Sequence, residues 1–312
     1  MRAFLFPGQG SQSVGMGAAL GDASRAARDV FEQVDEALDQ NLARLMRDGP
    51  DDELRLTENA QPAIMANSMA VFAALTKEGG VELAKAARFV AGHSLGEYSA
   101  LCAAGSFDLA TTAKLLKLRG QAMLAAVPVG VGAMAALLGA DVELARRIAD
   151  AAARGEVCGV ANDNDPSQVV LSGHKGAIDR AIDMAKEMGA RRAMPLPVSA
   201  PFHCPLMQPA AEAMRDALSY VVVEAPAVTL YANVTAAPES DPDRIRSLLV
   251  EQVTGLVRWR ESIIAMVDDG VGEFIELGGK VLGPMVKRTA PDVKVTSVAT
   301  IEDIEALAKE IA

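Results

Sequence analysis

Apolar residues follow two alternating patterns along the first 126 positions of the chain. Short continuous apolar runs at 3–6 and 89–91 are typical of buried strands. Between and after these runs, apolar residues recur at the spacing of an amphipathic helix. The predicted helices are at 24–38, at 60–78 with Pro62 in its first turn, at 95–104 and at 108–126.

The pattern changes between positions 132 and 196, where strand-like and helical segments are shorter. Strands are predicted at 133–138, 157–161, 169–172 and 192–196, and helices at 142–153 and 177–188. This β-α-β-β-α-β order is typical of the ferredoxin-like arrangement. We therefore expect a ferredoxin-like small domain at 128–197, inserted into a large domain made of 1–127 and 198–312.

Strands and helices alternate again after position 198. Strands are predicted at 228–231, 273–277 and 293–298, and helices after His203 and at 245–253, 261–267 and 281–289. Such alternation predicts a mostly parallel sheet covered by helices. The expected fold class is α/β, with a parallel sheet in the large domain.

Composition and charge exclude several classes of protein. Half of the 312 residues are hydrophobic and 23% are charged, which is typical of a globular protein and excludes disorder along the whole chain. The net charge of -11 argues against a nucleic-acid partner. The three cysteines contain no C-x-x-C pair, so neither a disulfide framework nor a cysteine zinc site is indicated, and we expect a reducing, cytoplasmic location.

No segment is expected to enter or cross a membrane. The charge-free stretch 120–140 contains Pro128 and several glycines, so it predicts a helix end, a turn and a buried strand. At the N-terminus, only four apolar residues separate Arg2 from Pro7, which is too short for the core of a signal peptide.

The strongest chemical signal is the G-x-S-x-G motif at 92–96, between a predicted strand and a predicted helix. Glycines permit a tight turn that exposes the hydroxyl of Ser94, and the N–H of Leu95 at the new helix start points to where an oxyanion forms. The alternative is a serine that merely caps a helix.

A serine nucleophile needs a base, and the chain contains three histidines. His93 is adjacent to Ser94, so their side chains diverge, and His174 is expected at the surface or as a helix cap. Elimination leaves His203, in a proline-bounded turn. No acid is indicated as a third member, because Asp163 and Asp165 lie in a segment that predicts a turn. We therefore expect a dyad, with a backbone carbonyl orienting the histidine.

Two further segments are candidates for the same site. The glycine loop at 8–10 has Ser13 where a dinucleotide-binding motif has its third glycine, so we expect it instead to flank Ser94 and to supply a second oxyanion donor. Arg119 stands in a mostly apolar predicted helix. It is either a solvated arginine on an amphipathic face or a clamp for a substrate carboxylate.

Together these segments resemble the malonyl-CoA:acyl carrier protein transacylases and, more broadly, the acyltransferase domains of fatty acid and polyketide synthases. The resemblance runs from Phe4 to about Thr289. It is carried by Phe6-Pro7-Gly8-Gln9-Gly10-Ser11-Gln12, Thr57-Glu58-Asn59-Ala60-Gln61-Pro62-Ala63, Gly92-His93-Ser94-Leu95-Gly96-Glu97-Tyr98, Arg119-Gly120, Asn162 with Gln168-Val169-Val170-Leu171-Ser172-Gly173, Val198-Ser199 with Phe202-His203, and Tyr231-Ala232-Asn233.

The resemblance implies a hydrolase-like large domain and a set of site residues. Ser94 is implied as nucleophile, His203 as base and Arg119 as clamp for the malonyl carboxylate. The oxyanion amides are those of Gln9 and Leu95, and a backbone carbonyl near Gln252 holds the histidine. Gln61, Asn162 and Phe202 are further substrate-binding candidates, with Phe202 placed to crowd an α-methyl branch. One departure is Thr254-Gly255-Leu256-Val257, where members often have Asn-Pro-Val, which concerns the local loop shape.

The implied activity is transfer of malonyl from malonyl-CoA to the phosphopantetheine thiol of acyl carrier protein through a seryl acyl-enzyme, by a monomer without a resident cofactor or metal. The alternatives are an acyltransferase of a polyketide pathway, a serine thioesterase or esterase, and a non-catalytic subunit. Because both implied substrates are anionic, we expect a local basic rim around the cleft. The candidates are Lys117, Arg191, Arg192, Lys280, Lys287 and Arg288.

Overall fold

The computed structural model describes residues 1–198 and 200–311; Ser199, part of one of the motifs above, and Ala312 lie outside the described residues. A six-stranded sheet in the order β10-β9-β1-β2-β7-β8 forms its centre. Its strands are β1 (Arg2–Phe6), β2 (Phe89–Gly92), β7 (Thr229–Ala232), β8 (Ala237–Glu239), β9 (Glu273–Leu277) and β10 (Lys294–Val298). Neighbouring strands are parallel except for β8, which is antiparallel to β7.

Helices cover both faces of this sheet because side chains along each strand alternate between the faces. In β1, Phe4 and Phe6 enter the larger core with α5, α7 and α8, whereas Ala3 and Leu5 pack against α13 and α14. The helices of this part are α1 (Ala18–Ala23), α2 (Arg25–Leu38), α3 (Leu42–Asp48), α4 (Asp51–Leu54), α5 (Thr57–Ala73), α6 (Leu83–Ala86), α7 (Gly96–Ala103), α8 (Leu109–Ala126), α11 (Gln208–Ser219), α12 (Pro242–Thr254), α13 (Trp259–Asp268), α14 (Leu282–Thr289) and α15 (Ile301–Ile311).

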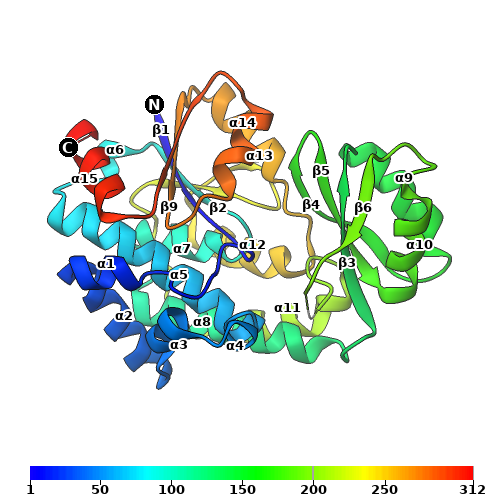
Figure 1. The fold of residues 1–312 in the computed structure, drawn as a ribbon, viewed down its shortest axis with the longest axis horizontal. Coiled ribbons are helices and arrows are strands. Elements are labelled where there is room, and N and C mark those ends of the chain that lie inside the picture. The colour runs from blue at the N-terminus through cyan, green and yellow to red at the C-terminus, as the bar shows by residue number, and fades with distance from the viewer. Residues whose placement is uncertain (199, 312) are drawn as a thin grey trace.

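A second sheet lies to one side of the first (Figure 1). Its strands are β3 (Gly132–Leu138), β4 (Cys158–Asp165), β5 (Gln168–His174) and β6 (Arg192–Pro195), all antiparallel, in the order β4-β5-β3-β6. The helices α9 (Val142–Ala153) and α10 (Lys175–Ala185) pack on it. The predicted α/β class is confirmed, including the β-α-β-β-α-β order of this segment. The domain boundaries at 127/128 and 197/198 remain a prediction.

Two local predictions are wrong. The segment around Asp163 and Asp165, expected as a turn, is the end of strand β4, and both carboxylates are buried. The helix expected at 60–78 begins at Thr57, so Pro62 lies inside α5 rather than in its first turn, and its last residues, Ala74–Glu78, form a π-helical turn.

The end of β4 joins the two sheets, because it pairs with a segment of the large unit as well as with β5. The amide of Asp163 donates to the carbonyl of Val257 at 3.0 Å, and the amide of Val257 donates to the carbonyl of Ala161 at 2.9 Å. Asp163 is ion-paired with Arg260 at 2.8 Å. These long-range partners override the turn tendency of the local sequence.

No helix within the described ranges 1–198 and 200–311 is both long enough and apolar enough to cross a membrane.

Candidate active site

Ser94 stands on a sharp turn between β2 and α7. Its φ of 54° is in the left-handed region, which is costly for a residue with a side chain and is typical of functional sites. The flanking glycines are required sterically: a Cβ on Gly92 would lie 1.9 Å from the carbonyl of Gly96, and a Cβ on Gly96 would lie 2.2 Å from the carbonyl oxygen of Phe6. The chain therefore turns here only with glycine at both positions.

His203 reaches Ser94 from the segment before α11. Its Nε2 lies 2.8 Å from Oγ of Ser94, and its Nδ1 lies 2.8 Å from the main-chain carbonyl of Gln252. Because a carbonyl only accepts, Nδ1 carries the hydrogen and Nε2 is free to accept the serine proton. Burial and the positive charge of Arg119 lower the pKa of His203 to about 3, so the imidazole is neutral before substrate binds.

Arg119 projects from α8 into the same site and is 2% exposed, so the alternative of a solvated arginine is wrong. Its Nη2 donates to Oγ of Ser94 at 3.1 Å and to Oε1 of Gln252 at 2.9 Å, and its Nη1 donates to Oε1 of Gln61 at 2.8 Å. Neutral oxygens thus hold the guanidinium, with Nη2 directed at the hydroxyl of Ser94. This arrangement can receive a carboxylate beside the reacting centre.

These side chains line one cavity of about 220 Å³ between the two sheets. The predicted residues in its wall are Gln9, Gln61, Ser94, Leu95, Arg119, Asn162, Phe202 and His203. Gln252 is not in the wall. Its side chain lies behind Arg119 and donates to the carbonyl of Ser94 at 3.1 Å, so it contacts the site residues rather than the open space.

The two residues whose amides are the predicted oxyanion donors, Gln9 and Leu95, both line the cavity. Among the described residues, neither the N–H of Gln9 nor that of Leu95 donates a hydrogen bond. The Gln9 side chain is bonded to Oγ1 of Thr57 at 3.2 Å, which fixes the loop. Gly8 packs so closely on the turn at Ser94 that a Cβ on Gly8 would lie 2.6 Å from the carbonyl oxygen of His93. Two unused amides beside a serine hydroxyl are suited to stabilising a tetrahedral oxyanion.

The other two histidines have different partners. Nε2 of His93 lies 2.8 Å from Oδ1 of Asn164 in β4, and its ring packs edge-on to Trp259. Nδ1 of His174 accepts the amide of Val157 at 2.9 Å, as befits a structural residue near a helix start. The structure thus brings only His203, of the three, to the hydroxyl of Ser94.

Comparison with known proteins shows the family of this fold and site. The profile of the acyl transferase domain family matches residues 3–301. The chain belongs to this family. A malonyl CoA-acyl carrier protein transacylase of Bacillus subtilis is 43% identical over 305 residues, 97% of this chain and 95% of that protein.

Solved structures of other acyl transferases agree with this assignment. The acyl-carrier-protein S-malonyltransferase of Bartonella henselae superposes with a TM-score of 0.97 at 52% identity, covering 99% of each chain. A malonyl-transacylase solved in complex with a type II PKS acyl-carrier protein superposes with a TM-score of 0.95 at 37% identity, also covering 99% of each chain.

In this acyl transferase, two polar residues that the sequence did not single out as site residues stabilise the turn at Ser94. Oδ1 of Asn233 accepts the amide of Ser94 at 2.8 Å, and its Nδ2 donates to the carbonyl of Gly92 at 2.7 Å. Glu97, in the first turn of α7, accepts the amide of Asn233 at 3.0 Å. The available signal for both was their place in two of the motifs that carry the family resemblance.

The departure at 254–257 leaves the histidine contact in place. Helix α12 ends at Thr254, and the carbonyl of Gln252 still meets His203. Val257 then pairs with β4 through its main chain. Since these contacts are made by backbone atoms, the different side chains in this loop do not disturb them.

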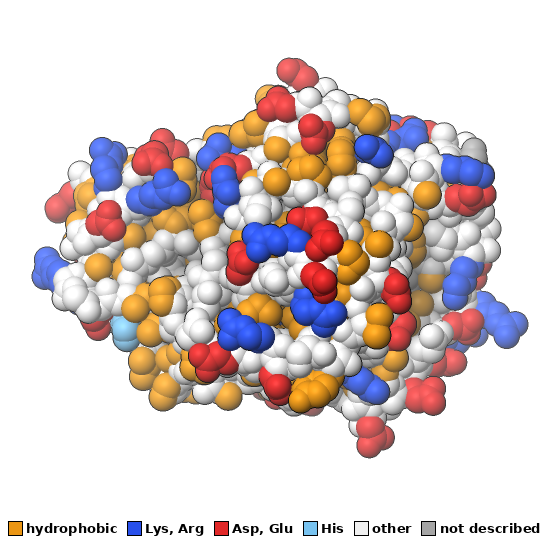
Figure 2. Space-filling view, turned by 180° about the vertical axis from the view of Figure 1, so that it is seen from behind, with side chains coloured by type: hydrophobic (Ala, Val, Ile, Leu, Met, Phe, Trp, Pro, Cys, Tyr) orange, Lys and Arg blue, Asp and Glu red, His pale blue; other side chains and the backbone are white. Residues whose placement is uncertain are grey.

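None of the six candidates for a basic rim is among the described residues that line the cavity, and three of them are bonded elsewhere. Lys117 is bonded to Gln40 and Asn59, Lys287 to two main-chain carbonyls, and Arg288 to the buried Asp165. Figure 2 shows basic and acidic side chains interspersed over one face of the molecule. A basic residue that the sequence did not indicate, Arg55, lines the cavity and is paired with Asp51 at 2.5 Å.

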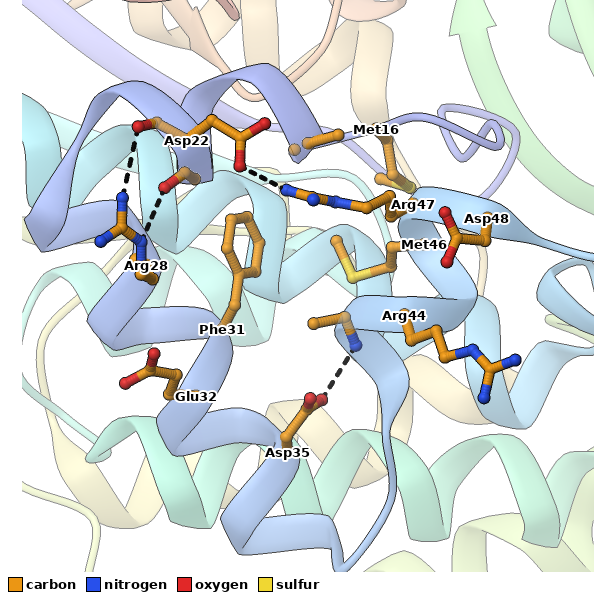
Figure 3. Close-up of a pocket in the computed structure, with 14 residues that line it drawn as sticks. Met16, Asp22, Arg28, Phe31, Glu32, Asp35, Arg44, Met46, Arg47 and Asp48 are labelled. Atoms are coloured by element: carbon orange, nitrogen blue, oxygen red, sulfur yellow. Dashed lines mark hydrogen bonds and ion pairs between the residues drawn. The ribbon is translucent and has the colours of Figure 1, made fainter.

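A second hollow, of about 360 Å³, lies between α1, α2 and α3 (Figure 3). Phe31 and Met46 form part of its floor, and Arg47 is paired with Asp22 at 2.6 Å. Among the described residues, its wall holds no serine, cysteine or histidine. Nowhere in 1–198 or 200–311 do three or more histidine, cysteine or acidic side chains gather so that they could hold a metal ion.

Proposed function

We propose that this protein transfers malonyl groups from malonyl-CoA to the phosphopantetheine thiol of an acyl carrier protein for fatty acid synthesis. The observation that carries the proposal is the contact of Arg119 with the Ser94–His203 pair, because it sets a carboxylate-binding cation at the nucleophile. Membership of the acyl transferase family and full-length similarity to malonyl transacylases support it.

In the first half-reaction His203 acts as the base. Nε2 takes the proton of the Ser94 hydroxyl while Oγ attacks the thioester carbonyl, and the amides of Gln9 and Leu95 hold the oxyanion. Collapse of the intermediate breaks the carbon–sulfur bond, and the CoA thiolate leaves with the proton from His203. A positioned base contributes on the order of 10²- to 10⁴-fold in rate, and each oxyanion donor roughly 10²- to 10³-fold.

The second half-reaction uses the same groups in reverse order. The phosphopantetheine thiol gives its proton to Nε2 of His203 and attacks the ester carbonyl on Ser94. When the carbon–oxygen bond breaks, the proton returns to the serine oxygen. No resident cofactor is needed, because every proton is accepted and returned by His203.

Arg119 selects the acyl group in this scheme. A carboxylate in the cavity would form charge-assisted hydrogen bonds to the guanidinium, and such bonds contribute about 1.5 to 3 kcal/mol each. Gln61 bonds to the same guanidinium, and Phe202 and Asn162 complete the wall around the acyl group. An acetyl group lacks the carboxylate and gains none of these bonds.

The test is a transfer assay with malonyl-CoA and a holo carrier protein, read by the mass of the carrier. Wild type is expected to load the carrier, Ser94→Ala is expected to load none, and free malonate is expected to form far more slowly than malonyl-carrier. Malonate release as the main outcome would instead support a thioesterase. Carrier proteins of fatty acid and of polyketide pathways are compared in the same assay, because one similar malonyl-transacylase was solved with a polyketide carrier.

We also propose that the protein works as a monomer in the cytoplasm. The supports are that one chain supplies Ser94, His203 and Arg119 together, and that all three cysteines are unpaired. Sedimentation at working concentration tests the first part: a dimer would contradict it.

A further inference from the structure

Glu97 is a buried carboxyl group beside the nucleophile to which the mechanism above assigns no role. It lies in the first turn of α7 and is 1% exposed. Its Oε2 accepts hydrogen bonds from the amide of Asn233 and from Nε2 of Gln252, both at 3.0 Å. Its Oε1 is fully buried and has no hydrogen-bond partner in the described part of the chain.

Arg119 is a buried cation that no carboxylate of the described residues contacts through a hydrogen bond or ion pair. Its acceptors are the neutral oxygens of Gln61, Ser94 and Gln252. A buried charge is costly unless an opposite charge lies nearby. The side chain of Gln252 connects this cation to Glu97, because its Oε1 accepts from Arg119 while its Nε2 donates to Glu97.

We propose that Glu97 is the counter-charge of Arg119 before substrate binds and takes up a proton when a carboxylate-bearing acyl group binds. The inference rests on the proposed function. With Glu97 ionised, the buried pair is neutral; a malonyl carboxylate beside Arg119 adds a second anion to the same guanidinium. A proton from the solvent restores the balance, and Oε1 is the atom free to hold it.

The setting of Glu97 makes this proton uptake accessible near neutral pH. Burial raises the pKa of Glu97 to about 7, although the amide of Asn233, the side chain of Gln252 and the charge of Arg119 act in the opposite direction. A carboxylate that offsets the charge of Arg119 removes one of these lowering effects. The pKa of Glu97 therefore rises further when malonyl binds.

The other titratable groups around Glu97 do not take over this role. Tyr98, next to it on α7, has its pKa raised to about 12 by burial, so it stays protonated. Burial lowers the pKa of both His93 and His203, so each stays neutral. On α12 the acidic neighbour of Gln252 is Glu251, which is exposed and directed to Arg244 at 2.8 Å.

Glu97 is thus a positioning residue with an electrostatic effect on selectivity. By linkage, a ligand that favours protonation of Glu97 binds more tightly as the pH falls through the pKa of that group. When the pH is lowered from 8.5 to 6.5, the affinity for malonyl-CoA is expected to rise about fivefold or more relative to that for acetyl-CoA. This is the usual size of the coupling between two binding events, here proton binding and ligand binding. Both thioesters carry the same CoA phosphates, so titration of the phosphates affects both affinities equally and cancels in the ratio of the two affinities.

The decisive experiment is titration calorimetry of the Ser94→Ala variant at pH 7.5, once with malonyl-CoA and once with acetyl-CoA. This variant can bind both thioesters but cannot be acylated by them. Each titration is repeated in two buffers of different ionisation enthalpy, which measures the protons exchanged. Malonyl-CoA is expected to take up more protons than acetyl-CoA, and the difference is expected to vanish in Ser94→Ala/Glu97→Gln. Equal uptake for the two esters overturns the inference.

Glu97→Gln is the matched variant because its amide oxygen can still accept from Asn233 and Gln252 while the charge is lost. If a folded Glu97→Gln variant retains the malonyl-dependent uptake, another group holds the proton and the inference is wrong. If the variant does not fold, equal proton uptake for the two thioesters on Ser94→Ala still overturns the inference. Failure of the wild type to form malonyl-enzyme would contradict the proposed function instead, and a mass spectrum detects that separately.

Discussion

Individual residues of the site depend on one another because they share hydrogen-bond partners. Gln252 contacts three of them: its carbonyl accepts from His203, its amide nitrogen donates to the carbonyl of Ser94, and its amide oxygen accepts from Arg119. A change at any of these residues therefore alters the geometry of the others. The preference for an acyl group with a carboxylate is expected to depend on the charge of Arg119, which Glu97 offsets in our proposal.

Arg119→Ala is predicted to reduce kcat/KM for malonyl-CoA while affecting acetyl-CoA much less. The loss of a charge-assisted carboxylate contact, about 1.5 to 3 kcal/mol, corresponds to roughly 10- to 150-fold. Steady-state transfer with both esters measures the ratio. Arg55→Ala is the control, since Arg55 lines the same cavity but is paired with Asp51. An unchanged preference in Arg119→Ala would exclude the carboxylate role.

At this scale the sequence predicted the central pair well. The G-x-S-x-G motif and the scarcity of histidines pointed to Ser94 and His203, which the structure places 2.8 Å apart. The burial of Glu97 and its contacts could not be predicted in the same way. They depend on Asn233 and Gln252, which are 136 and 155 positions further along the chain.

The elements of the fold are fixed near the site by close backbone packing. Strand β2 and helix α7 meet at Gly92 and Gly96, and the carbonyl oxygen of Phe6, at the end of β1, lies against Gly96. The parallel alternation of strands and helices predicted this meeting point, because loops at the carboxyl ends of parallel strands share one edge of the sheet. The segment 162–166, which the local sequence predicts to be a turn, shows the opposite case. Its hydrogen-bond partners are distant in sequence, and they make it part of strand β4 up to Asp165.

Gly96→Ala is predicted to destabilise the fold by about 1 to 3 kcal/mol and to abolish acylation of Ser94. The added Cβ would lie 2.2 Å from a backbone oxygen, so the two main-chain segments could separate only at a large cost in free energy. Urea denaturation and malonyl loading measure the two effects. Gly159→Ala is the matched control, because a Cβ there meets nothing within 4 Å. Equal stability of the two variants would contradict the packing argument.

The whole molecule depends on how the two sheets are joined, because the cavity is lined from both. Asp163 and Asp165 of β4 are fully buried and paired with Arg260 and Arg288, which belong to the helices of the large sheet. Burial raises the pKa of Asp163, and the bonds from Arg260 act against this. The hydrophobic pattern predicted both sheets, but the charge pairs between them have no local signal.

Arg260→Ala is predicted to cost about 3 kcal/mol of unfolding free energy, because it leaves Asp163 buried without its partner. The folded-state pKa of Asp163 then lies further above its unfolded value. The loss is therefore largest at high pH and shrinks as the pH falls and the carboxyl group is protonated. Urea denaturation at pH 8 and pH 5 measures this. Arg47→Ala breaks only an exposed pair, with Asp22, and is expected to cost about 1 kcal/mol or less at both values.

The central claim is that Ser94 carries the malonyl group between the two substrates. Intact-mass measurement after incubation with malonyl-CoA, without carrier protein, tests it most directly. Wild type is expected to gain the mass of one malonyl group, mapped to the peptide that contains Ser94, and to lose it when carrier protein is added. Absence of this adduct in wild type, or its presence in Ser94→Ala, would contradict the account.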